Sequence, residues 1–343
     1  MKTRKILLIV ILFIGVVLAY FAWNVFGPVV HNPQKKFLYI RTGSNYRAVK
    51  DSLQKNNMIK NTFWFDQVSS YAGYPENVKA GKFKVKDGMS LYHLIKMLRQ
   101  GKQAPVNLVI TKLRTKDDLA KKIGNEFEID SLTAMNFLNN EDSLKQFGVD
   151  TNTVMTDVIP NTYTYTWNTS MKNIFKKLYT EKQKFWNDER KQKAQRLDLS
   201  PQQVYTLASI VEEETNKDED KGKIASVYIN RMKKGMKLAA DPTVKYALRD
   251  FGLKRIYQKY LQFQSPYNTY LNTGLPPGPI CTPSIKTIDA VLNSPETNYL
   301  FFVARSDFSG YSDFASDYQQ HQVFAKAYQH ALDSVIQARQ KGE

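Results

Sequence analysis

Residues 200–215, SPQQVYTLASIVEEET, contain an unusually clear helix start and end in three consecutive glutamates before a threonine. Ser200 is placed as the N-cap, Pro201 as the first helical residue, and Gln203 as the partner that completes a capping box. The apolar run that follows favours a single helix to about Thr215. This stretch predicts a helix that packs on a core and carries carboxylates at its C-terminal end.

The three glutamates differ in the direction in which a helix would point them. Successive residues are rotated by about 100° around the helix axis. Measured from Glu214, Leu207 is offset by about 20° and Ile210 by about 40°, so Glu214 lies on the core-facing stripe. Glu213 is turned away by about 100° and Glu212 by about 160°, which predicts that both are surface carboxylates.

A carboxylate on an apolar stripe loses hydration, and its pKa rises. The negative end of the helix dipole pushes the pKa in the same direction. An acid that stays protonated near neutral pH is what cleavage of a glycosidic bond needs. The pattern leaves a second interpretation open, in which Glu214 is paired to Lys or Arg or reaches solvent.

Other catalytic chemistries lack support in the sequence. No P-loop, G-x-G-x-x-G or G-x-S-x-G motif is present, and the histidines show no metal-ligand spacing. These histidines are His31, His93, His321 and His330. The residues therefore give no pattern that supports metal or cofactor chemistry.

The segments around this helix predict a mixed α and β domain. A second helix is expected over residues 223–234, ending at Gly235. Residues 157–167 are β-rich, with Pro160 restricting the strand to a start or an edge. Residues 171–186 predict a helix with one apolar side, and its basic remainder is interpreted as a solvated face.

Closer to the N-terminus the chain contains an internal repeat. Residues 39–53 and 84–98 each have a short strand, a turn glycine, a polar cap and an amphipathic helix, and residues 108–123 resemble a degraded third copy. The glycines and caps are Gly43, Gly88, Ser44 and Ser90. The layout resembles LysM-like modules, which hold glycan chains. A packing domain that only spaces the next domain from the membrane is the alternative.

The first residues predict a membrane anchor. The run from Ile6 to Phe26 has no charge, and as a helix it reaches roughly 30 Å, the thickness of a bilayer core. A cleaved signal peptide usually has a shorter apolar region of about 7–15 residues. Because Lys2, Arg4 and Lys5 precede the run, the N-terminus is expected in the cytoplasm and the chain after Gly27 outside it.

The net charge of +17 attracts anionic partners, among them nucleic acid, acidic lipid and acidic wall polymer. The basic residues are spread along the chain and no zinc-finger or RNA-binding signature accompanies them, so no nucleic-acid partner is predicted. The single cysteine, Cys281, excludes an intrachain disulfide and is interpreted as a small buried residue.

Four blocks of the sequence, in order, resemble the MltG or YceG-like endolytic murein transglycosylases. They are LASIVEEET, KIASVYINRMKKGMKLAADPTVKYAL, SPYNTYLNTGLPPGPICTPS and NYLFFVA. The resemblance extends from about Tyr39 to the C-terminus and is strongest from Leu207 to Ala304. It implies that Glu214, the third position of the E-x-E-T block, is the catalytic acid, in agreement with the helical geometry.

The resemblance also implies a reaction, a place and partners. The reaction cleaves the MurNAc–GlcNAc β-1,4 bond of peptidoglycan without water and leaves a 1,6-anhydroMurNAc end. The substrate is nascent glycan strands, and the catalytic domain is expected on the periplasmic side of the inner (cytoplasmic) membrane, with cell-wall synthesis enzymes as the expected protein partners. The resemblance implies no metal and no cofactor. The residues expected to line the substrate cleft are Asp241, Asn230, Arg231, Tyr267, Asn268, Thr269 and Tyr270.

Three positions depart from the family pattern. Asn161 stands where an aspartate is more common, and Cys281 replaces a small residue. Tyr311 takes the place of a histidine found in some members, which argues against a role for a C-terminal histidine such as His321.

The predicted fold class is α+β, with an N-terminal transmembrane helix, a LysM-like strand–helix module and a mixed α+β lytic-transglycosylase domain. The expected divisions are a cytoplasmic N-terminus (1–5), a transmembrane helix (6–26), a linker (27–36), the LysM-like module (37–105) and the catalytic domain (106–343, core 155–330). Two alternative functions stay open. A hydrolytic muramidase would need a second carboxylate, for which Glu219 or Asp241 are the candidates, and a wall-binding scaffold would not need Glu214.

Overall fold

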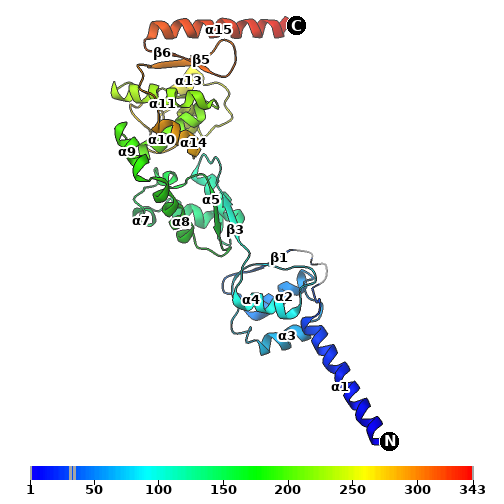
Figure 1. Ribbon diagram of the computed structural model, residues 1–343. Helices are drawn as coiled ribbons and strands as arrows, with labels where there is room; N and C mark the ends of the chain where they lie inside the picture. The colour runs from blue at the N-terminus through cyan, green and yellow to red at the C-terminus, as the bar shows by residue number, and fades with distance from the viewer. Residues whose placement is uncertain (1, 31–32, 34–35, 342–343) are drawn as a thin grey trace. The chain divides into compact units, whose positions relative to one another are not determined.

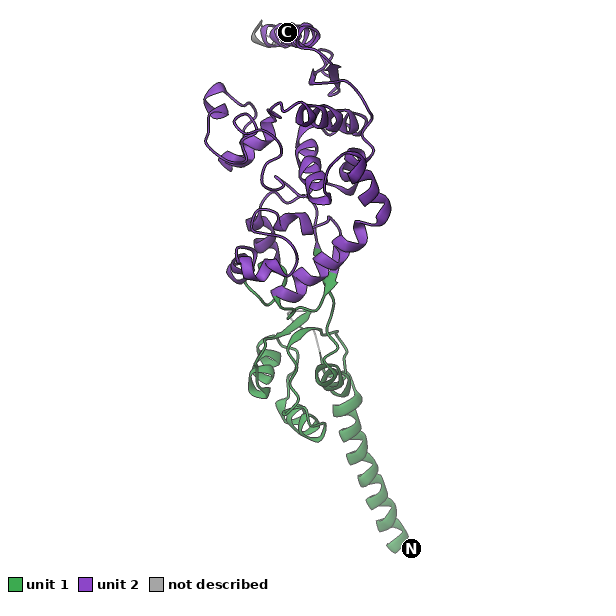
Figure 2. Ribbon diagram, turned by 90° about the vertical axis from the view of Figure 1, so that its left-hand side faces the viewer, with its two compact units in different colours: residues 1–108, 124–130, 164–170 green, residues 109–123, 131–163, 171–343 purple. Residues whose placement is uncertain are grey.

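The protein is described by a computed structural model, which covers residues 2–30, 33 and 36–341 and forms two compact units (Figure 2). Unit 1 comprises residues 1–108, 124–130 and 164–170, and unit 2 comprises residues 109–123, 131–163 and 171–343. Helices predominate, and the short strands form two-stranded sheets. The structure therefore confirms the predicted α+β class.

Unit 1 begins with α1 (Lys2–Phe26), the blue helix at the N-terminus in Figure 1. Within Thr3–Phe26 a window of 18 residues has a mean hydropathy of 2.9, and this helix is long and apolar enough to cross a membrane. Four residues of the expected linker of residues 27–36 lie outside the described residues, namely 31, 32, 34 and 35. The remaining elements of unit 1 are β1 (Phe37–Ile40), α2 (Tyr46–Lys55), α3 (Thr62–Tyr71), β2 (Gly81–Lys84) and α4 (Leu91–Gln100).

Two strands of one sheet in unit 1 lie at the starts of the two predicted repeats, but earlier than expected: β1 ends at the second residue of the first repeat and β2 at the first residue of the second. β1 pairs antiparallel with β2, with Phe37 opposite Lys84, and each strand is followed by a turn glycine at positive φ. Ser90 caps α4 as predicted. The prediction that Ser44 caps α2 is wrong, because the side chain of Asn45 accepts the hydrogen bond from the backbone of the first turn. The likeness to a LysM module stays a prediction.

A second two-stranded sheet joins β3 (Val106–Val109) to β4 (Thr162–Tyr165). Pro160 precedes β4, as its missing N–H requires. α5 (Lys116–Glu126) follows β3, so the third, degraded copy of the repeat also has a strand followed by a helix.

Unit 2 is largely helical and ends in a small antiparallel sheet under a long C-terminal helix. Its helices before the site are α6 (Ser131–Leu138), α7 (Glu141–Lys145), a 3₁₀ turn (Val154–Asp157), α8 (Met171–Phe185) and α9 (Asp188–Arg196). The elements from the site onward are α10 (Pro201–Glu214), α11 (Asp218–Lys233), α12 (Asp241–Leu248), α13 (Gln258–Leu261), α14 (Ile285–Leu292), β5 (Phe301–Ala304), β6 (Ser312–Ala315) and α15 (Tyr318–Lys341).

α10 is the central helix of unit 2. The predicted N-cap and capping box of Ser200 and Gln203 are both present. The helix packs against α11, α12 and α14, and every residue from Val204 to Val211 is buried. α11 begins at Asp218 and not near Lys223, because three acidic residues occupy its first turn, where the helix dipole favours negative charge.

α8 confirms the predicted apolar side but corrects the interpretation of its basic residues. Its buried apolar side chains are Met171, Ile174, Phe175 and Leu178. Lys182 is not on a solvated face: it is buried, and its ammonium group lies 2.5 Å from a carboxylate oxygen of the fully buried Asp157. A buried ammonium group needs a carboxylate partner to offset the loss of hydration. Helical periodicity cannot show where such a partner lies.

Candidate functional site

Glu214 is the last residue of α10, and the chain turns to extended backbone at Thr215. The side chain is only partly accessible to solvent. Its Oε1 accepts a hydrogen bond of 2.6 Å from the hydroxyl of Tyr228, which comes from the adjacent helix α11 and is 1% exposed. One oxygen of the carboxylate is therefore held by the protein.

Burial raises the pKa of Glu214 to about 7. The Tyr228 hydrogen bond lowers that pKa, the charge of Asp241 raises it, and the charges of Lys245 and Arg231 lower it. Within the described residues Glu214 forms no ion pair, so the direct pairing to Lys or Arg left open by the sequence is not found. A carboxyl group with a pKa near 7 can donate a proton and then accept one at neutral pH.

Tyr228 is suited to act as a hydrogen-bond donor to this carboxyl group. Burial raises the pKa of the Tyr228 hydroxyl well above its ordinary value, and the neighbouring carboxylate of Glu214 adds to the increase. The phenol therefore stays protonated, and its hydroxyl hydrogen can point at Glu214 over the whole physiological range.

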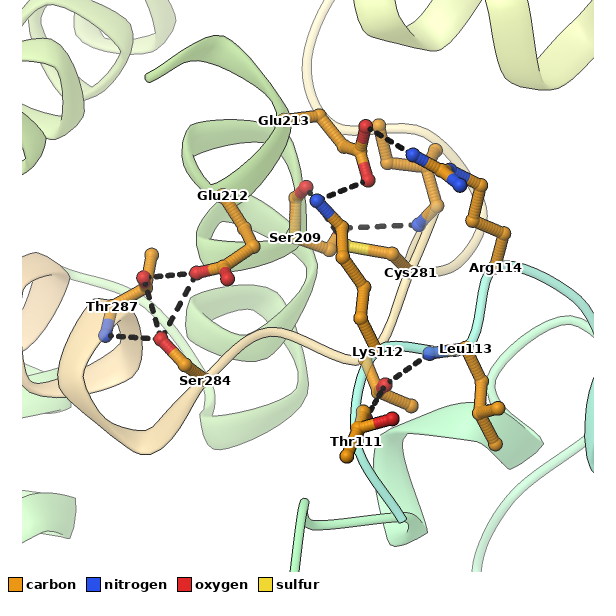
Figure 3. A network of polar contacts seen from close by, with 12 residues as sticks. Thr111, Lys112, Leu113, Arg114, Ser209, Glu212, Glu213, Cys281, Ser284 and Thr287 are labelled. Carbon is orange, nitrogen blue, oxygen red and sulfur yellow. Dashed lines mark hydrogen bonds and ion pairs between the residues drawn. The ribbon is translucent and has the colours of Figure 1, made fainter. Parts of the chain in front are cut away.

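The prediction that Glu212 is a surface carboxylate is wrong. Its side chain is 16% exposed and accepts hydrogen bonds from Ser284 (3.0 Å) and from Thr287 of α14 (Figure 3). The Lys221 ammonium lies 3.7 Å from the same carboxylate. α14 covers the side of α10 that the sequence assigned to solvent, so a carboxylate there is held by the first turn of another helix.

Glu213 is also paired and not free at the surface. Its side chain is 18% exposed, and its carboxylate lies 2.7 Å from Lys112 and 3.2 Å from Arg114 (Figure 3). Burial alone would raise the pKa of Glu213, but the hydrogen bonds and charges of Lys112 and Arg114 hold it below its ordinary value. Neighbouring carboxyl groups at the end of α10 therefore differ in protonation: Glu213 is ionised at neutral pH and Glu214 is poised to titrate.

Three of the predicted cleft residues lie within electrostatic reach of Glu214. Asp241, at the exposed start of α12, accepts a hydrogen bond of 2.7 Å from the hydroxyl of Tyr270, and the charges of both Asp241 and Arg231 act on Glu214. Glu214 in turn raises the pKa of Tyr270, although less than the burial of this tyrosine does. The structure brings these groups together from α11, α12 and the following loop.

Arg231 has its guanidinium group fixed by the backbone. Its Nε donates to the Leu300 carbonyl at 2.7 Å and one terminal nitrogen donates to the Leu238 carbonyl at 2.6 Å. These two bonds use donors on two edges of the guanidinium plane, so Arg231 supplies a positive charge of fixed position near the carboxyl group of Glu214.

The side chains of Asn268 and Thr269 form hydrogen bonds to neighbouring backbone segments. Asn268 is fully buried, and its amide nitrogen donates to two carbonyl oxygens of the 261–263 segment, each at 2.9 Å. The Thr269 hydroxyl is also buried and accepts from the backbone N–H of Ala240 at 3.0 Å. Both side chains bond to the protein itself and fix the loop that presents Tyr270.

Asn230 and Tyr267 likewise make contacts within the protein. The amide of Asn230 donates to the carbonyl oxygens of Thr297 and Tyr299 at 2.8 and 3.0 Å. The ring of Tyr267 packs on Tyr246 with a centroid separation of 4.7 Å. These contacts join α11 to the segment after α14, and α12 to the segment after α13.

The 274–281 loop is attached to α10 by a hydrogen bond. The Ile280 N–H donates to the Ser209 hydroxyl at 3.0 Å, and the adjacent Cys281 is buried, which confirms the prediction for this cysteine (Figure 3). A Cβ added at Gly278 would come within 2.0 Å of the Asn152 carbonyl oxygen. A side chain at this position is therefore excluded, and the loop keeps one shape beside the helix.

Sequence reasoning missed two groups that set the behaviour of Glu214. Tyr228 matches an ordinary apolar position of α11, and Lys245 matches an ordinary basic position of α12. The only signal was that both lie in the sequence blocks that follow the E-x-E-T block. Helical periodicity could not select them, since it orients residues on one helix and not across two.

Comparison with known proteins gives a consistent result. The family model described as the YceG-like family matches residues 38–327 of this chain. An endolytic murein transglycosylase of Bacillus subtilis is 31% identical over 284 residues, which cover 78% of each protein. An endolytic murein transglycosylase of Streptococcus pneumoniae is 28% identical, and the matched part covers 77% of this chain and 53% of the longer pneumococcal protein.

A solved structure shares the fold. The crystal structure of a YceG-like protein from Listeria monocytogenes superposes with a TM-score of 0.55 at 27% sequence identity, and the match covers 84% of this chain and 98% of that one.

Proposed function

Because the chain belongs to the YceG-like family, we propose that it is an endolytic peptidoglycan transglycosylase that cleaves glycan strands internally. The bond cleaved is the MurNAc–GlcNAc β-1,4 linkage, and the product is a 1,6-anhydroMurNAc end. The reaction needs an acid, a base and an internal nucleophile, and the sugar supplies the nucleophile. No cofactor enters the proposed reaction.

Glu214 serves first as the acid and then as the base. The protonated carboxyl group gives its proton to the glycosidic oxygen as the bond to C1 of MurNAc breaks, so GlcNAc leaves with a free hydroxyl. The resulting carboxylate takes the proton of the MurNAc C6 hydroxyl while that oxygen bonds to C1. Glu214 ends the cycle protonated, and no water is consumed.

The observation that supports this proposal most strongly is the state of Glu214. Its pKa near 7 means that both the acid and the base forms are populated at neutral pH, as a group acting in both directions requires. Glu213, the adjacent carboxylate, is held ionised by two cations and could not donate a proton. The hydrogen bond from Tyr228 to Oε1 fixes the orientation of the Glu214 carboxyl group.

Asp241, Tyr270 and Arg231 are the proposed substrate contacts. Asp241 is exposed at the start of α12, and Tyr270 is partly exposed, so both can reach sugar hydroxyls or N-acetyl groups. Arg231 adds a fixed positive charge, which favours the carboxylate form of Glu214 that exists after the first proton transfer.

A hydrolytic muramidase is the second candidate, because Asp241 offers a further carboxylate whose charge acts on Glu214. In that reaction Asp241 would direct a water molecule to the sugar, and the product would have a reducing end. Glu219, the other carboxylate considered, is exposed in the first turn of α11 and has no such interaction with Glu214.

Digestion of purified peptidoglycan followed by mass spectrometry separates these functions. We expect anhydro-ended fragments of intermediate length, which differ from hydrolysed ends by the mass of one water. Reducing ends would identify a muramidase, and the absence of cleavage by folded protein would favour a wall-binding scaffold. The Glu214→Gln variant should release no fragments above the background of protein-free peptidoglycan.

The place of the reaction follows from α1. We infer that α1 crosses the cytoplasmic membrane once, with Lys2, Arg4 and Lys5 on the cytoplasmic side and both units outside. Anchoring keeps the site close to strands as they are made, so enzymes of cell-wall synthesis are the expected neighbours. Protease added to spheroplasts should digest both units and spare the N-terminus.

A further inference from the structure

Unit 1 contains a large basic hollow that the proposed cleavage reaction does not use. It has a volume of about 850 Å³, and the described residues that line it include four lysines, one acidic residue, Asp87, and both apolar and uncharged polar side chains. The lysines are Lys84, Lys86, Lys96 and Lys102, and all four are exposed. Within the described residues none of the four forms an ion pair, so their charges are available to a ligand.

The hollow lies where the chain leaves the apolar helix. Phe26, the last residue of α1, lines it together with Met89 and Met97. The backbone after α1 is attached to the same wall, because the Val29 and Val30 N–H groups donate to the Met89 carbonyl at 3.2 and 3.1 Å. If α1 spans a bilayer, the hollow is at the height of the lipid head groups.

The aromatic residues of α3 agree with this height when α1 spans a bilayer. The ring of Trp64 packs on Tyr20 and Phe21 of α1, with centroid separations of 5.9 and 4.9 Å. Phe21 lies about 8 Å along the helix before Phe26, at a rise of about 1.5 Å per residue. α3 therefore reaches the depth at which the hydrocarbon begins, where tryptophan and tyrosine are preferred.

Two further side chains of α3 fit an interface between water and lipid. Phe63 is 58% exposed and Tyr71 is 97% exposed, although both are large and apolar over most of their surface. In water each ring exposes apolar surface that is not stabilised by packing. At a membrane surface the same ring enters the interfacial layer. The part of unit 1 nearest the end of α1 thus presents aromatic residues and lysines together.

We propose that this hollow binds the phosphate head group of an anionic phospholipid in the leaflet that α1 leaves. The lysine ammonium groups pair with the phosphate, and Phe26, Met89 and Met97 contact the glycerol and the first carbons of the acyl chains. The apolar side chains beside the four ammonium groups fit the acyl chains of a lipid, which a glycan strand does not have. The bound lipid would hold unit 1 against the membrane surface, in addition to the tether that α1 provides.

Native mass spectrometry of the full chain in detergent tests this binding site. The protein is titrated with phosphatidylglycerol and, separately, with zwitterionic phosphatidylcholine, and the retained lipid is counted. The test variant replaces the four lysines of the hollow by glutamine. A charge-matched control replaces exposed lysines of unit 2 by glutamine, namely Lys121, Lys145, Lys172 and Lys176.

We expect one phosphatidylglycerol to be retained in preference to phosphatidylcholine, with an affinity at least about tenfold lower in the glutamine variant. The unit 2 control should retain the lipid as the unaltered protein does, and a variant with four arginines in the hollow should also retain it. Salt at 0.5 M should weaken retention in the unaltered protein.

Several results would overturn the assignment. Equal retention of the two lipids, or unchanged retention in the glutamine variant, would show that the lysines select no phosphate. Displacement of phosphatidylglycerol by soluble peptidoglycan fragments would identify the hollow as a glycan site. Displacement by an equimolar polyprenyl diphosphate would assign it to a lipid carrier and not to phospholipid. These readouts do not involve cleavage, so they are independent of the proposed enzymatic function.

Discussion

Replacing Glu214 by glutamine should abolish cleavage and, at alkaline pH, stabilise the fold. Glutamine keeps the size of the side chain and can still accept the Tyr228 hydrogen bond. It can neither give a proton to the leaving oxygen nor take one from the C6 hydroxyl. General acid–base catalysis contributes about 10²–10⁴-fold, and because one group serves both steps the loss should reach or exceed that range.

The expected gain in stability follows from the pKa of Glu214. The folded protein holds this pKa at about 7, against an ordinary value of 4.5, so the folded state binds the proton more tightly than the unfolded state. The resulting stabilisation is complete below pH 4.5 and is lost as the pH rises through 7. At about 1.4 kcal/mol per unit of pKa, the loss amounts to about 3 kcal/mol. Glutamine does not ionise, so the variant does not lose this stability as the pH rises.

Urea unfolding of residues 27–343, which lack α1, measures this effect at pH values from 5 to 8.5. The difference in unfolding free energy between variant and unaltered protein should rise with pH and level off above about pH 8. Glu296→Gln, at an exposed carboxylate, is the control and should show no such rise. A difference that stays flat with pH would refute the raised pKa, and anhydro-ended products at a near-normal rate would refute the catalytic role.

Tyr228→Phe removes a hydrogen bond that lowers the pKa of Glu214, so the alkaline limb of the pH–rate profile should move up by about 0.5–1 unit; an unmoved profile would mean that the hydroxyl does not act on the acid. Glu213→Gln should leave the cleavage pattern unchanged but destabilise unit 2 by about 1–2 kcal/mol in urea unfolding, because its two cationic partners, each 38% exposed, lose their counter-charge. Lys182→Met should cost about 3–5 kcal/mol by leaving Asp157 buried without a cation, and the loss should shrink towards pH 4, where protonation of the carboxyl group removes the charge. If the loss is as large at pH 4 as at pH 8, the buried charge is not its cause.

The contrast among the three glutamates shows how far a local pattern can be trusted. The angle between Glu214 and the apolar stripe correctly placed this side chain against the core, since that angle depends only on the rise and rotation of one helix. The same angles predicted that Glu212 and Glu213 are exposed to solvent, and this prediction is wrong. They assumed that α10 has a solvent face, but α14 and the 111–114 segment cover it.

The sequence by itself determined the features whose interactions lie within a few residues of each other. These are the capping box of α10, the strand–turn–helix order of unit 1, the apolar length of α1 and the direction of Glu214. Each depends on backbone periodicity or on a hydrogen bond that closes within one turn. Such interactions recur wherever the same residues occur in the same order.

Only the tertiary structure decided which groups meet. Tyr228 lies 14 positions from Glu214, Arg114 lies 99 positions from Glu213, and the buried Lys182 lies 25 positions from Asp157. No periodic pattern extends over such separations. The protonation state of each carboxyl group depends on the charge and burial supplied by those distant partners, so the chemistry of the site is fixed by packing between helices.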